Sequence, residues 1–464
     1  MGLATKVIKG HTLSVFALVM MNVIAIDNLR NLSLGAMYGL SLVFFYSLAA
    51  ILFFIPTILV TAELATGWPN TGGAYIWVRE AFGSRWGFFS IWLQWIYNVV
   101  WYPTIFAFIA GILAYLIDPS LVNHRGYMVG IILPAFWCTT LINCIGLNVA
   151  GWVSIIGAIL GTIVPMLFIA ALSFFWVHAG HVSQIHMSVH GFLPTQAHWQ
   201  DIAFFTSILF GLMGMEMSAV HAGDVRNPKR NYPRALLYSA IIIFVTLVLS
   251  CLAIAIVVPH DQLNLVSALM DAFTLFLSAY HLQYLTPVIA VLIIIGSLSG
   301  ATAWILGPAR ALMVATEDTH LPAFLSKCNS KNMPVGILVT QGVIVTLISL
   351  IFVLMPTVNS AYWVLSNLTA QLALLFYILF FSAAIRLRYK HPQVDRAYQI
   401  PGGLIGIWIV CGVGIVTCVA AIALGFFPPN TIASKDVGTY EMILIGGIVV
   451  CCLVPLFFRK NKKI

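Results

Sequence analysis

The stretch "NVIAIDNLRNLSLG" (residues 22–35) determines how the rest of the chain is interpreted. It places Asp27 and Arg30 in an otherwise apolar segment that is long enough to span a bilayer. A charge at the bilayer centre costs about 2.5–3.5 kcal/mol on insertion scales, so such charges are rare and usually mark a pathway. Two opposite charges three residues apart could neutralise each other on an intact helix. Alternatively, the helix unwinds there and exposes both side chains to a site, and we favour this second arrangement.

The composition of the whole chain is that of a polytopic membrane protein. Hydrophobic residues make up 61% of the 464 residues and charged residues 8%, with a mean hydropathy of +1.00, whereas soluble domains carry about 25% charged residues. A spanning helix needs about 20 apolar residues. Twelve such stretches are present, at residues 11–36, 39–64, 86–116, 127–147, 150–177, 201–222, 235–258, 284–313, 335–355, 361–386, 403–426 and 439–458. We therefore predict an all-α membrane protein with 12 transmembrane helices.

Lysine and arginine residues are distributed unevenly over the loops. The chain has 22 Lys and Arg residues and a formal net charge of +8. Arg30 is within a span and Arg125 and Lys435 are in odd-to-even loops, whereas all the others are in the two tails or in the even-to-odd loops with their span ends. The positive-inside rule thus predicts a multi-pass protein of the inner (plasma) membrane with both termini cytoplasmic. The basic loops serve as topology signals, so we expect no nucleic-acid partner.

The sequence predicts neither a signal peptide nor a metal centre. The first span lacks a small-residue cleavage site and is interpreted as a permanent span. The eight cysteines lie mostly inside spans without metal-ligand spacing, so we interpret them as small apolar packing residues. We expect no metal and no cofactor, with the lipid bilayer and small molecules as partners.

The first and sixth spans share polar residues and glycines at mid-depth. The first carries "IAIDNLRNLSLG", and the sixth carries "LFGLMGMEMSAVHAG" with Gly211, Gly214 and Glu216. Because these spans are five apart, corresponding elements of spans 1–5 and 6–10 run in opposite directions, which is typical of an inverted repeat with two broken helices. We predict a single transmembrane domain over 1–464, with repeats over 1–178 and 200–390 and two peripheral helices over 403–458.

Broken helices have a specific chemical use. A half-helix exposes unpaired N–H groups at its positive N-terminal end and unpaired carbonyls at its C-terminal end. Such ends can hold a carboxylate and an ammonium group together, so the backbone pattern points to zwitterionic ligands such as amino acids.

Several motifs in a specific order carry a family resemblance. They are "RNLSLGAMYGLSLVFFY", "LVTAELATGWPNTGGAYIWVREAFGSRWGF", "GMEMSAVHAGDVRNPKRNYPRA", "AWILGPARAL" and "LRYKHPQVDRAYQIPGG", and they cover about residues 20 to 405. The chain resembles the amino acid–polyamine–organocation transporter superfamily, in particular its branch of glutamate/γ-aminobutyrate antiporters. The resemblance implies a five-plus-five inverted repeat with broken helices 1 and 6, two peripheral helices, and amino acid exchange by alternating access.

The sequence departs from this family pattern in two places. Many members break the first helix at a Gly-Ser-Gly run, whereas here no glycine precedes Gly35 in the expected break. The acid-resistance antiporters of this branch carry a longer C-terminal tail. Gating by such a tail is therefore not expected for a chain that ends at Ile464.

The charged residues of the two expected breaks are the main candidates for substrate binding. Arg30 offers a guanidinium fork to an acidic side chain or a substrate carboxylate, and Asp27 could favour an amine-bearing substrate. Glu216 could bridge the two broken helices or carry a coupled proton; alternatively, it is a structural carboxylate bound to backbone N–H groups. The neighbouring residues Ile26, Asn28, Leu29 and Asn31 are expected to contribute backbone groups to the site.

Aromatic and amide side chains complete the predicted site. Trp304 and Tyr377 resemble the family's cavity-lining positions in spans 8 and 10, and a ring there could cover an ammonium group. Their motif context ranks them above Trp92, Trp95 and Trp101, since 13% of the chain is aromatic. Asn98 and Gln371 are polar residues in apolar spans, so each either lines the site or forms a helix-to-helix hydrogen bond.

Polar groups outside the spans are interpreted more simply. Glu63, the stretch 70–75, Arg79 and Arg85 could form a cytoplasmic gate, but a loop-anchoring role is favoured, and the same holds for His221 and Asp224. The outer loop with five histidines is interpreted as a solvated loop in preference to a pH-responsive or metal-binding surface. The residues 265–280, "LVSALMDAFTLFLSAY", have the periodicity of a helix lying along the membrane surface.

These patterns favour a secondary active transporter of amino acids, of the glutamate/γ-aminobutyrate antiporter type. One alternative is a proton-coupled amino acid symporter that uses Glu216. An alternative of a different class is an intramembrane transferase, but the sequence places no nucleophile, histidine and carboxylate together. The substrates and the oligomeric state are not determined by the sequence.

Overall fold

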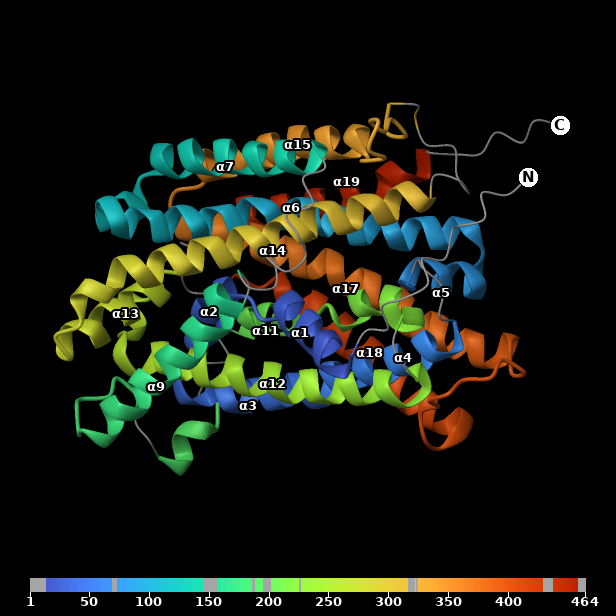
Figure 1. Cartoon of the computed structure of the whole chain (residues 1–464), viewed down its shortest axis with the longest axis horizontal. Coiled ribbons are helices and arrows are strands. Elements are labelled where there is room, and N and C mark those ends of the chain that lie inside the picture. The colour runs from blue at the N-terminus through green and yellow to red at the C-terminus, as the bar shows by residue number, and fades with distance from the viewer. Residues whose placement is uncertain are drawn as a thin grey trace.

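The computed structural model describes residues 14–68, 73–145, 157, 159–185, 188–194, 202–224, 227–315, 322, 324–428 and 437–457. All regular structure within these residues is helical. Eleven described helices are long and apolar enough to cross a membrane, and a bent helix pair at the start of the chain makes twelve. The long helices run side by side around a centre of short segments (Figure 1). The predicted all-α membrane fold is confirmed.

Each described span coincides with a predicted one. The first six are α1 (Val15–Ile26) with η1 (Leu29–Asn31) and α2 (Leu32–Ala36); η2 (Gly39–Ser41), α3 (Leu42–Ala49), η3 (Ala50–Phe54) and α4 (Ile55–Gly67) in one span; α6 (Ser84–Ile117); α7 (Arg125–Ile145); η5 (Ile159–Ile163) with α9 (Val164–His178); and η7 (Ile202–Phe204), α11 (Phe205–Gly211) and η8 (Met215–Asp224). The last six are α12 (Pro228–Val257); η10 (Gln283–Leu285) with α14 (Thr286–Ala315); α15 (Val335–Ser349) with α16 (Ile351–Leu354); α17 (Val358–Lys390); α18 (Gly403–Gly425); and α19 (Val437–Leu453) with η12 (Val454–Phe457).

Shorter helices connect some of the spans. They are α5 (Gly73–Phe82), η4 (Pro119–Asn123), η6 (Val189–Phe192), η9 (His260–Gln262) and α13 (Ala268–Ala279). The helix predicted within 265–280 is α13, which buries Phe273 and Phe276 against the bundle. The predicted span residues 11–13, 146, 147, 150–156, 158, 201 and 458, together with Asn70 to Gly72, His186 and His198, lie outside the described residues.

The first span is interrupted without a glycine. Asp27 and Asn28 leave the helical conformation with φ values of −64° and −123° and extended ψ values, which side-chain-bearing residues adopt without strain. The Asn28 side chain accepts a hydrogen bond from the Arg30 backbone N–H at 3.1 Å and so caps the next helical turn. The two halves, Val15–Ile26 and Leu29–Ala36, are bent by 42°. An asparagine cap therefore performs here the role expected of glycine.

The sixth span is interrupted at a glycine that the backbone requires. Gly214 has a φ of +119°, a conformation that other residues rarely adopt. Ile26 and Trp304 also pack against the position where a side chain at Gly214 would begin. Helix α1 contacts η8, and α11 contacts both η1 and α2, so the two interrupted spans lie side by side.

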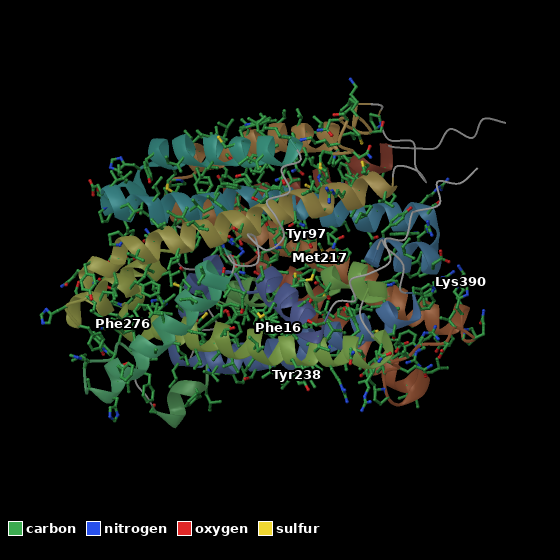
Figure 2. All side chains as sticks on the ribbon, in the orientation of Figure 1. Phe16, Tyr97, Met217, Tyr238, Phe276 and Lys390 are labelled. Atoms are coloured by element: carbon green, nitrogen blue, oxygen red, sulfur yellow. The ribbon has the colours of Figure 1, made fainter. Side chains whose placement is uncertain are left out.

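Two long helices hold this interrupted pair in place. Helix α6 packs against α14 and α17. In the most apolar 18-residue stretch of each helix, 78% of the residues are buried in α6 and in α17, against 11% in α19. Figure 2 places Lys390 and Phe276 at opposite ends of the long axis, with Tyr97 of α6 between them. The interrupted spans and α6 thus meet midway along the bundle.

Candidate functional site

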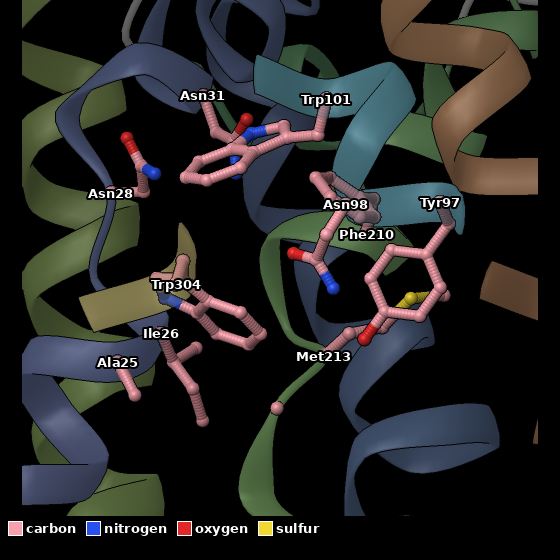
Figure 3. A pocket seen from close by; sticks show the side chains of 11 residues that line it. Ala25, Ile26, Asn28, Asn31, Tyr97, Asn98, Trp101, Phe210, Met213 and Trp304 are labelled. Carbon is pink, nitrogen blue, oxygen red and sulfur yellow. The ribbon is translucent and has the colours of Figure 1, made fainter. Parts of the chain in front are cut away.

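A buried cavity lies where the two interrupted spans meet α6 and α14. Its empty volume is about 400 Å³, which includes space open to solvent. Its lining residues come from four spans, and Figure 3 shows their side chains converging. The lining residues are Ala25, Ile26, Asn28, Asn31, Tyr97, Asn98, Trp101, Phe210, Met213, Gly214 and Trp304.

Three asparagines give this cavity its polar groups. The Asn98 side-chain NH₂ donates to the carbonyl of Gln94 at 2.7 Å, which leaves its amide oxygen available as an acceptor. The Asn31 side-chain oxygen accepts from Arg30 Nη2 at 2.6 Å. Because a guanidinium group only donates, this contact fixes the Asn31 amide with its NH₂ group directed elsewhere. The cavity thus has the Asn98 oxygen as a side-chain acceptor, while the Asn31 NH₂ group lies next to Gly211.

Arg30 is fully buried behind the cavity wall and does not line it. Its Nη1 donates to the hydroxyls of Thr104 and Ser366, both at 3.0 Å. The guanidinium carbon lies 5.5 to 6.0 Å from the ring centroids of Tyr362, Phe210 and Trp101. Within the described part of the chain, no carboxylate forms an ion pair with Arg30. Asp27 and Arg30 are therefore not the neutralising pair that an intact helix would form.

Asp27 faces away from Arg30 and toward α12. Its Oδ2 accepts from the Thr246 hydroxyl at 2.9 Å, while Oδ1 has no hydrogen-bond partner among the described residues. The side chain is 3% exposed. Asp27 and Leu29 line a second, adjacent cavity.

Glu216 and Tyr377 connect the sixth span to α17. The Tyr377 hydroxyl donates to Glu216 Oε2 at 2.6 Å and accepts from the Gly214 backbone N–H at 2.9 Å. Both side chains are buried, and neither lines the cavity. In the described residues Glu216 has no cationic partner, and its Oε1 has no hydrogen-bond partner. This carboxyl group is therefore stabilised by a neutral hydroxyl group and not by a charge.

A pair of tryptophans forms one wall of the cavity. The Trp304 and Trp101 ring centroids lie 6.2 Å apart, and the Tyr102 hydroxyl donates to the Trp304 backbone carbonyl at 2.8 Å. The sequence ranked Trp304 above Trp101 as a cavity-lining residue, but both rings line the cavity. Sequence reasoning also missed Tyr97, Phe210 and Met213. The available signal was spacing, since Tyr97, Asn98 and Trp101 share one face of α6.

Besides Arg30, Glu216 and Tyr377, two further predicted site residues line neither cavity. Gln371 donates to the Ile422 carbonyl at 3.3 Å and packs beside Gly425, so it belongs to the contact between α17 and α18. Gly211 does not line the cavity, but a side chain there would meet the Asn31 amide at 3.4 Å. Gln371 thus matches the alternative of a helix-to-helix hydrogen bond, and Gly211 provides space for Asn31.

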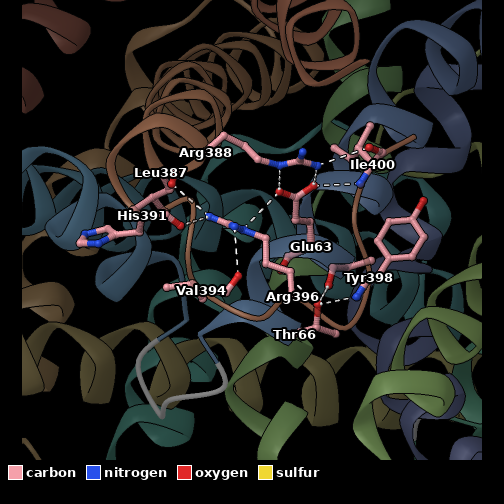
Figure 4. Close-up of polar contacts among 10 residues, drawn as sticks. Glu63, Thr66, Leu387, Arg388, His391, Val394, Arg396, Tyr398 and Ile400 are labelled. Atoms are coloured by element: carbon pink, nitrogen blue, oxygen red, sulfur yellow. Dashed lines mark hydrogen bonds and ion pairs between the residues drawn. The ribbon is translucent and has the colours of Figure 1, made fainter. Parts of the chain in front are cut away.

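A separate charged cluster joins α4 to the end of α17 and the loop after it (Figure 4). Glu63 forms a two-point ion pair with Arg388 and a second pair with Arg396 at 3.5 Å, and it accepts from the Ile400 N–H at 2.9 Å. Arg396 also donates to the carbonyls of Leu387, His391 and Val394. Burial lowers the pKa of Arg396, while the charge of Glu63 opposes that shift. These contacts favour the predicted anchoring role of Glu63 over a gate with Arg79, which pairs with Glu80.

No group of three or more His, Cys, Asp or Glu side chains in the described residues is arranged to hold a metal ion. The side chains of His221 and Asp224 lie outside the described residues.

An all-helical bundle with two interrupted spans around a buried mid-depth cavity is the architecture of a secondary transporter. The amino acid permease family model matches residues 11–449, and the chain belongs to this family. It is 52% identical to an uncharacterized transporter of Legionella pneumophila over 97% of both chains. It is also 32% identical to a glutamate/gamma-aminobutyrate antiporter of Lactococcus lactis, over 87% of this chain and 82% of that protein. A probable agmatine/putrescine antiporter of Lactococcus lactis is 24% identical over 89% of this chain and 87% of that protein. Because the chain belongs to a transporter family, the alternative of an intramembrane transferase is excluded.

Proposed function

We propose that this protein exchanges amino acids across the inner membrane by alternating access, with both termini cytoplasmic and with repeats over 1–178 and 200–390. The observation that carries the proposal is the meeting of two interrupted spans at one buried cavity. The relatives named as glutamate/gamma-aminobutyrate antiporters support acidic amino acids and their amine products as the substrates.

The ends of the half-helices would recognise the two charges of an amino acid. The starts of η1 and η8 carry the positive end of the helix dipole, which favours a carboxylate, while the Arg30 and Gly214 N–H groups are themselves bound by Asn28 and Tyr377. The end of α1 presents carbonyl groups, which favour an ammonium group. Ile26, Asn28 and Gly214 lie at these ends and line the cavity. Arg30 would act by orienting Asn31 and by its positive charge, not by direct contact with the substrate.

Glu216 supports proton-coupled symport as a second candidate. A buried carboxyl group without a cationic partner is expensive to keep ionised, so a proton is a suitable occupant. Its contact with Tyr377 and the Gly214 N–H ties any change of charge to the break in the sixth span. In an antiporter the same group would be a structural link between the sixth span and α17.

Counterflow into proteoliposomes tests the proposal and separates the two candidates. Vesicles loaded with unlabelled glutamate should take up external labelled glutamate or γ-aminobutyrate at least about tenfold faster than empty vesicles. Uptake into empty vesicles that is equally fast and is driven by an inward proton gradient would contradict exchange and indicate symport. Under symport, Glu216→Gln should abolish the effect of the gradient, whereas exchange should keep its dependence on internal substrate in that variant.

A further inference from the structure

A second cavity lies beside the first, across the Trp101–Trp304 pair. Its empty volume is about 380 Å³, which includes space open to solvent, and it shares Ala25, Asn28, Trp101 and Trp304 with the first cavity. Along α6, the first cavity is lined by residues 97 and 98 and the second by residue 105, so Trp101 separates them. The other lining residues are Ile24, Asp27, Leu29, Thr162, Gly296, Ser297, Gly300 and Ala301.

Among the described residues, Asp27 is the only ionisable side chain that lines this second cavity. Its Oδ2 is bound by the neutral hydroxyl of Thr246, and its Oδ1 is buried without a partner in the described residues. No cationic side chain of the described residues forms an ion pair with it. A buried carboxylate in this state is costly unless a positive group joins it. A cationic group placed beside the unpartnered oxygen would offset that cost.

The rest of the cavity wall also suits a cation. The last turn of α1 contributes Ile24 and Ala25, and its carbonyl groups carry the negative end of the helix dipole. Trp101 and Trp304 present aromatic rings, which attract cations at their faces. Ser297 provides a hydroxyl acceptor. A primary ammonium group has three N–H donors, so these acceptors match its needs.

We propose that the second cavity binds the ammonium group of ω-amino acid substrates, with Asp27 as the counter-charge. The carboxylate of such a substrate would remain in the first cavity, at the half-helix ends, and its methylene chain would run past the Trp101–Trp304 pair along Ala25 and Asn28, which also line both cavities. This inference rests on the proposed amino acid transport. γ-Aminobutyrate, whose amine and carboxylate lie at opposite ends, then needs both cavities. Glutamate, with its amine next to a carboxylate, needs the second cavity less.

A substitution at Gly300 can fill this cavity without altering a charged side chain. A Cβ built at Gly300 meets no atom within 4 Å, whereas Gly296 is in close contact with Gly161. Gly300→Leu therefore places a side chain in the second cavity without a backbone clash. Gly412 of α18 is equally open and lines neither cavity, so Gly412→Leu is the matched control.

The test measures half-saturation concentrations for homo-exchange of labelled glutamate and of labelled γ-aminobutyrate in proteoliposomes. The ratio of the γ-aminobutyrate value to the glutamate value should rise at least about tenfold in Asp27→Asn and in Gly300→Leu. Asp27→Glu should restore part of the wild-type ratio, and Gly412→Leu should leave the ratio unchanged. If Asp27→Asn does not fold, Gly300→Leu carries the test alone.

The possible failures are distinct. An unchanged ratio in Gly300→Leu, or glutamate exchange by wild-type protein without any γ-aminobutyrate exchange, would overturn the ammonium site and leave amino acid exchange standing. A flattened pH dependence in Asp27→Asn with an unchanged ratio would overturn it in favour of a proton carried by Asp27. Wild-type protein that exchanges no amino acid would instead overturn the proposed function.

Discussion

Two buried groups of charges in this protein are arranged in opposite ways. At the end of α17, the Glu63 carboxylate contacts Arg388 and Arg396, and both of its oxygens are bound. At the centre of the bundle, Asp27, Arg30 and Glu216 are each buried, and within the described residues none has an ion-pair partner. The central charges are instead held by hydroxyl and side-chain amide groups.

This difference separates charges that hold the fold from charges that serve a ligand. A buried ion pair with saturated hydrogen bonds compensates the cost of desolvation, and removing one partner is costly. When a buried charge is held only by neutral groups, part of its desolvation cost is not compensated. A substrate or a proton that binds there can therefore gain binding energy. We therefore expect substitutions in the Glu63 cluster to act mainly on stability and substitutions at the centre to act mainly on transport.

The largest effect on stability should come from Glu63→Ala. This change leaves Arg388 and Arg396 facing each other without an anion, and breaking a buried ion pair in this way costs about 3–5 kcal/mol. The measurement is the free energy of unfolding from a denaturant titration in detergent micelles. Glu80→Ala, which removes a half-exposed partner of Arg79, should cost about 0–1 kcal/mol. Equal losses in the two variants would abolish the distinction between the cluster and an ordinary surface pair.

The architecture was largely predictable from the sequence because hydrophobic length is a direct physical requirement of the bilayer. The predicted boundaries are close for α18, expected over 403–426 and observed over Gly403–Gly425, whereas α12, expected from residue 235, already begins at Pro228. The two breaks were located by their glycines and charges. The mechanism of the first break was not predictable from glycine rules, since Asn28 caps the second half-helix through its side chain.

The site was predicted less completely, because facing directions depend on helix packing. Asn98, Trp304, Asn28 and Asn31 do line the cavity. Gln371, equally polar in its span, faces α18 instead. A lone polar residue in an apolar helix carries no information on which neighbour it meets, and this information comes only from the packing of α17.

The next effect separates transport from stability at the centre. Arg30→Met should change the free energy of unfolding by about 1 kcal/mol or less, because it removes an unpaired buried charge while retaining apolar volume. It should lower the uptake of acidic amino acids about tenfold, since the Asn31 amide loses the contact that orients it. Both quantities are measured on one protein preparation. Arg30→Lys keeps the charge but lacks the fork that reaches Thr104, Ser366 and Asn31 together, so it should not restore uptake. If Arg30→Met showed full uptake, Arg30 would belong with the charges that hold the fold and not with those that serve a ligand.

The smallest effect concerns Asp271, a carboxyl group of α13 outside the spans that is held by hydroxyl groups, as Asp27 and Glu216 are. It accepts hydrogen bonds from Tyr115 and Ser267. Burial raises the pKa of Asp271, and the hydrogen bonds oppose that shift. The folded state therefore holds the proton more tightly than the unfolded state, so the protonated group adds stability at low pH, and this contribution is lost as the pH rises through the folded pKa.

The melting temperature of the wild-type protein relative to Asp271→Asn should therefore fall by a few degrees as the pH rises from about 4 to 7. Thermal unfolding of both proteins across this pH range measures the difference. A difference that grows with pH would mean that hydroxyl groups alone stabilise the ionised carboxylate at this site. The same contacts at Asp27 and Glu216 would then suffice to keep those carboxylates charged, and the case for a missing cation or proton at the centre would weaken. A fall with pH would support the view that a hydroxyl contact does not replace a counter-charge.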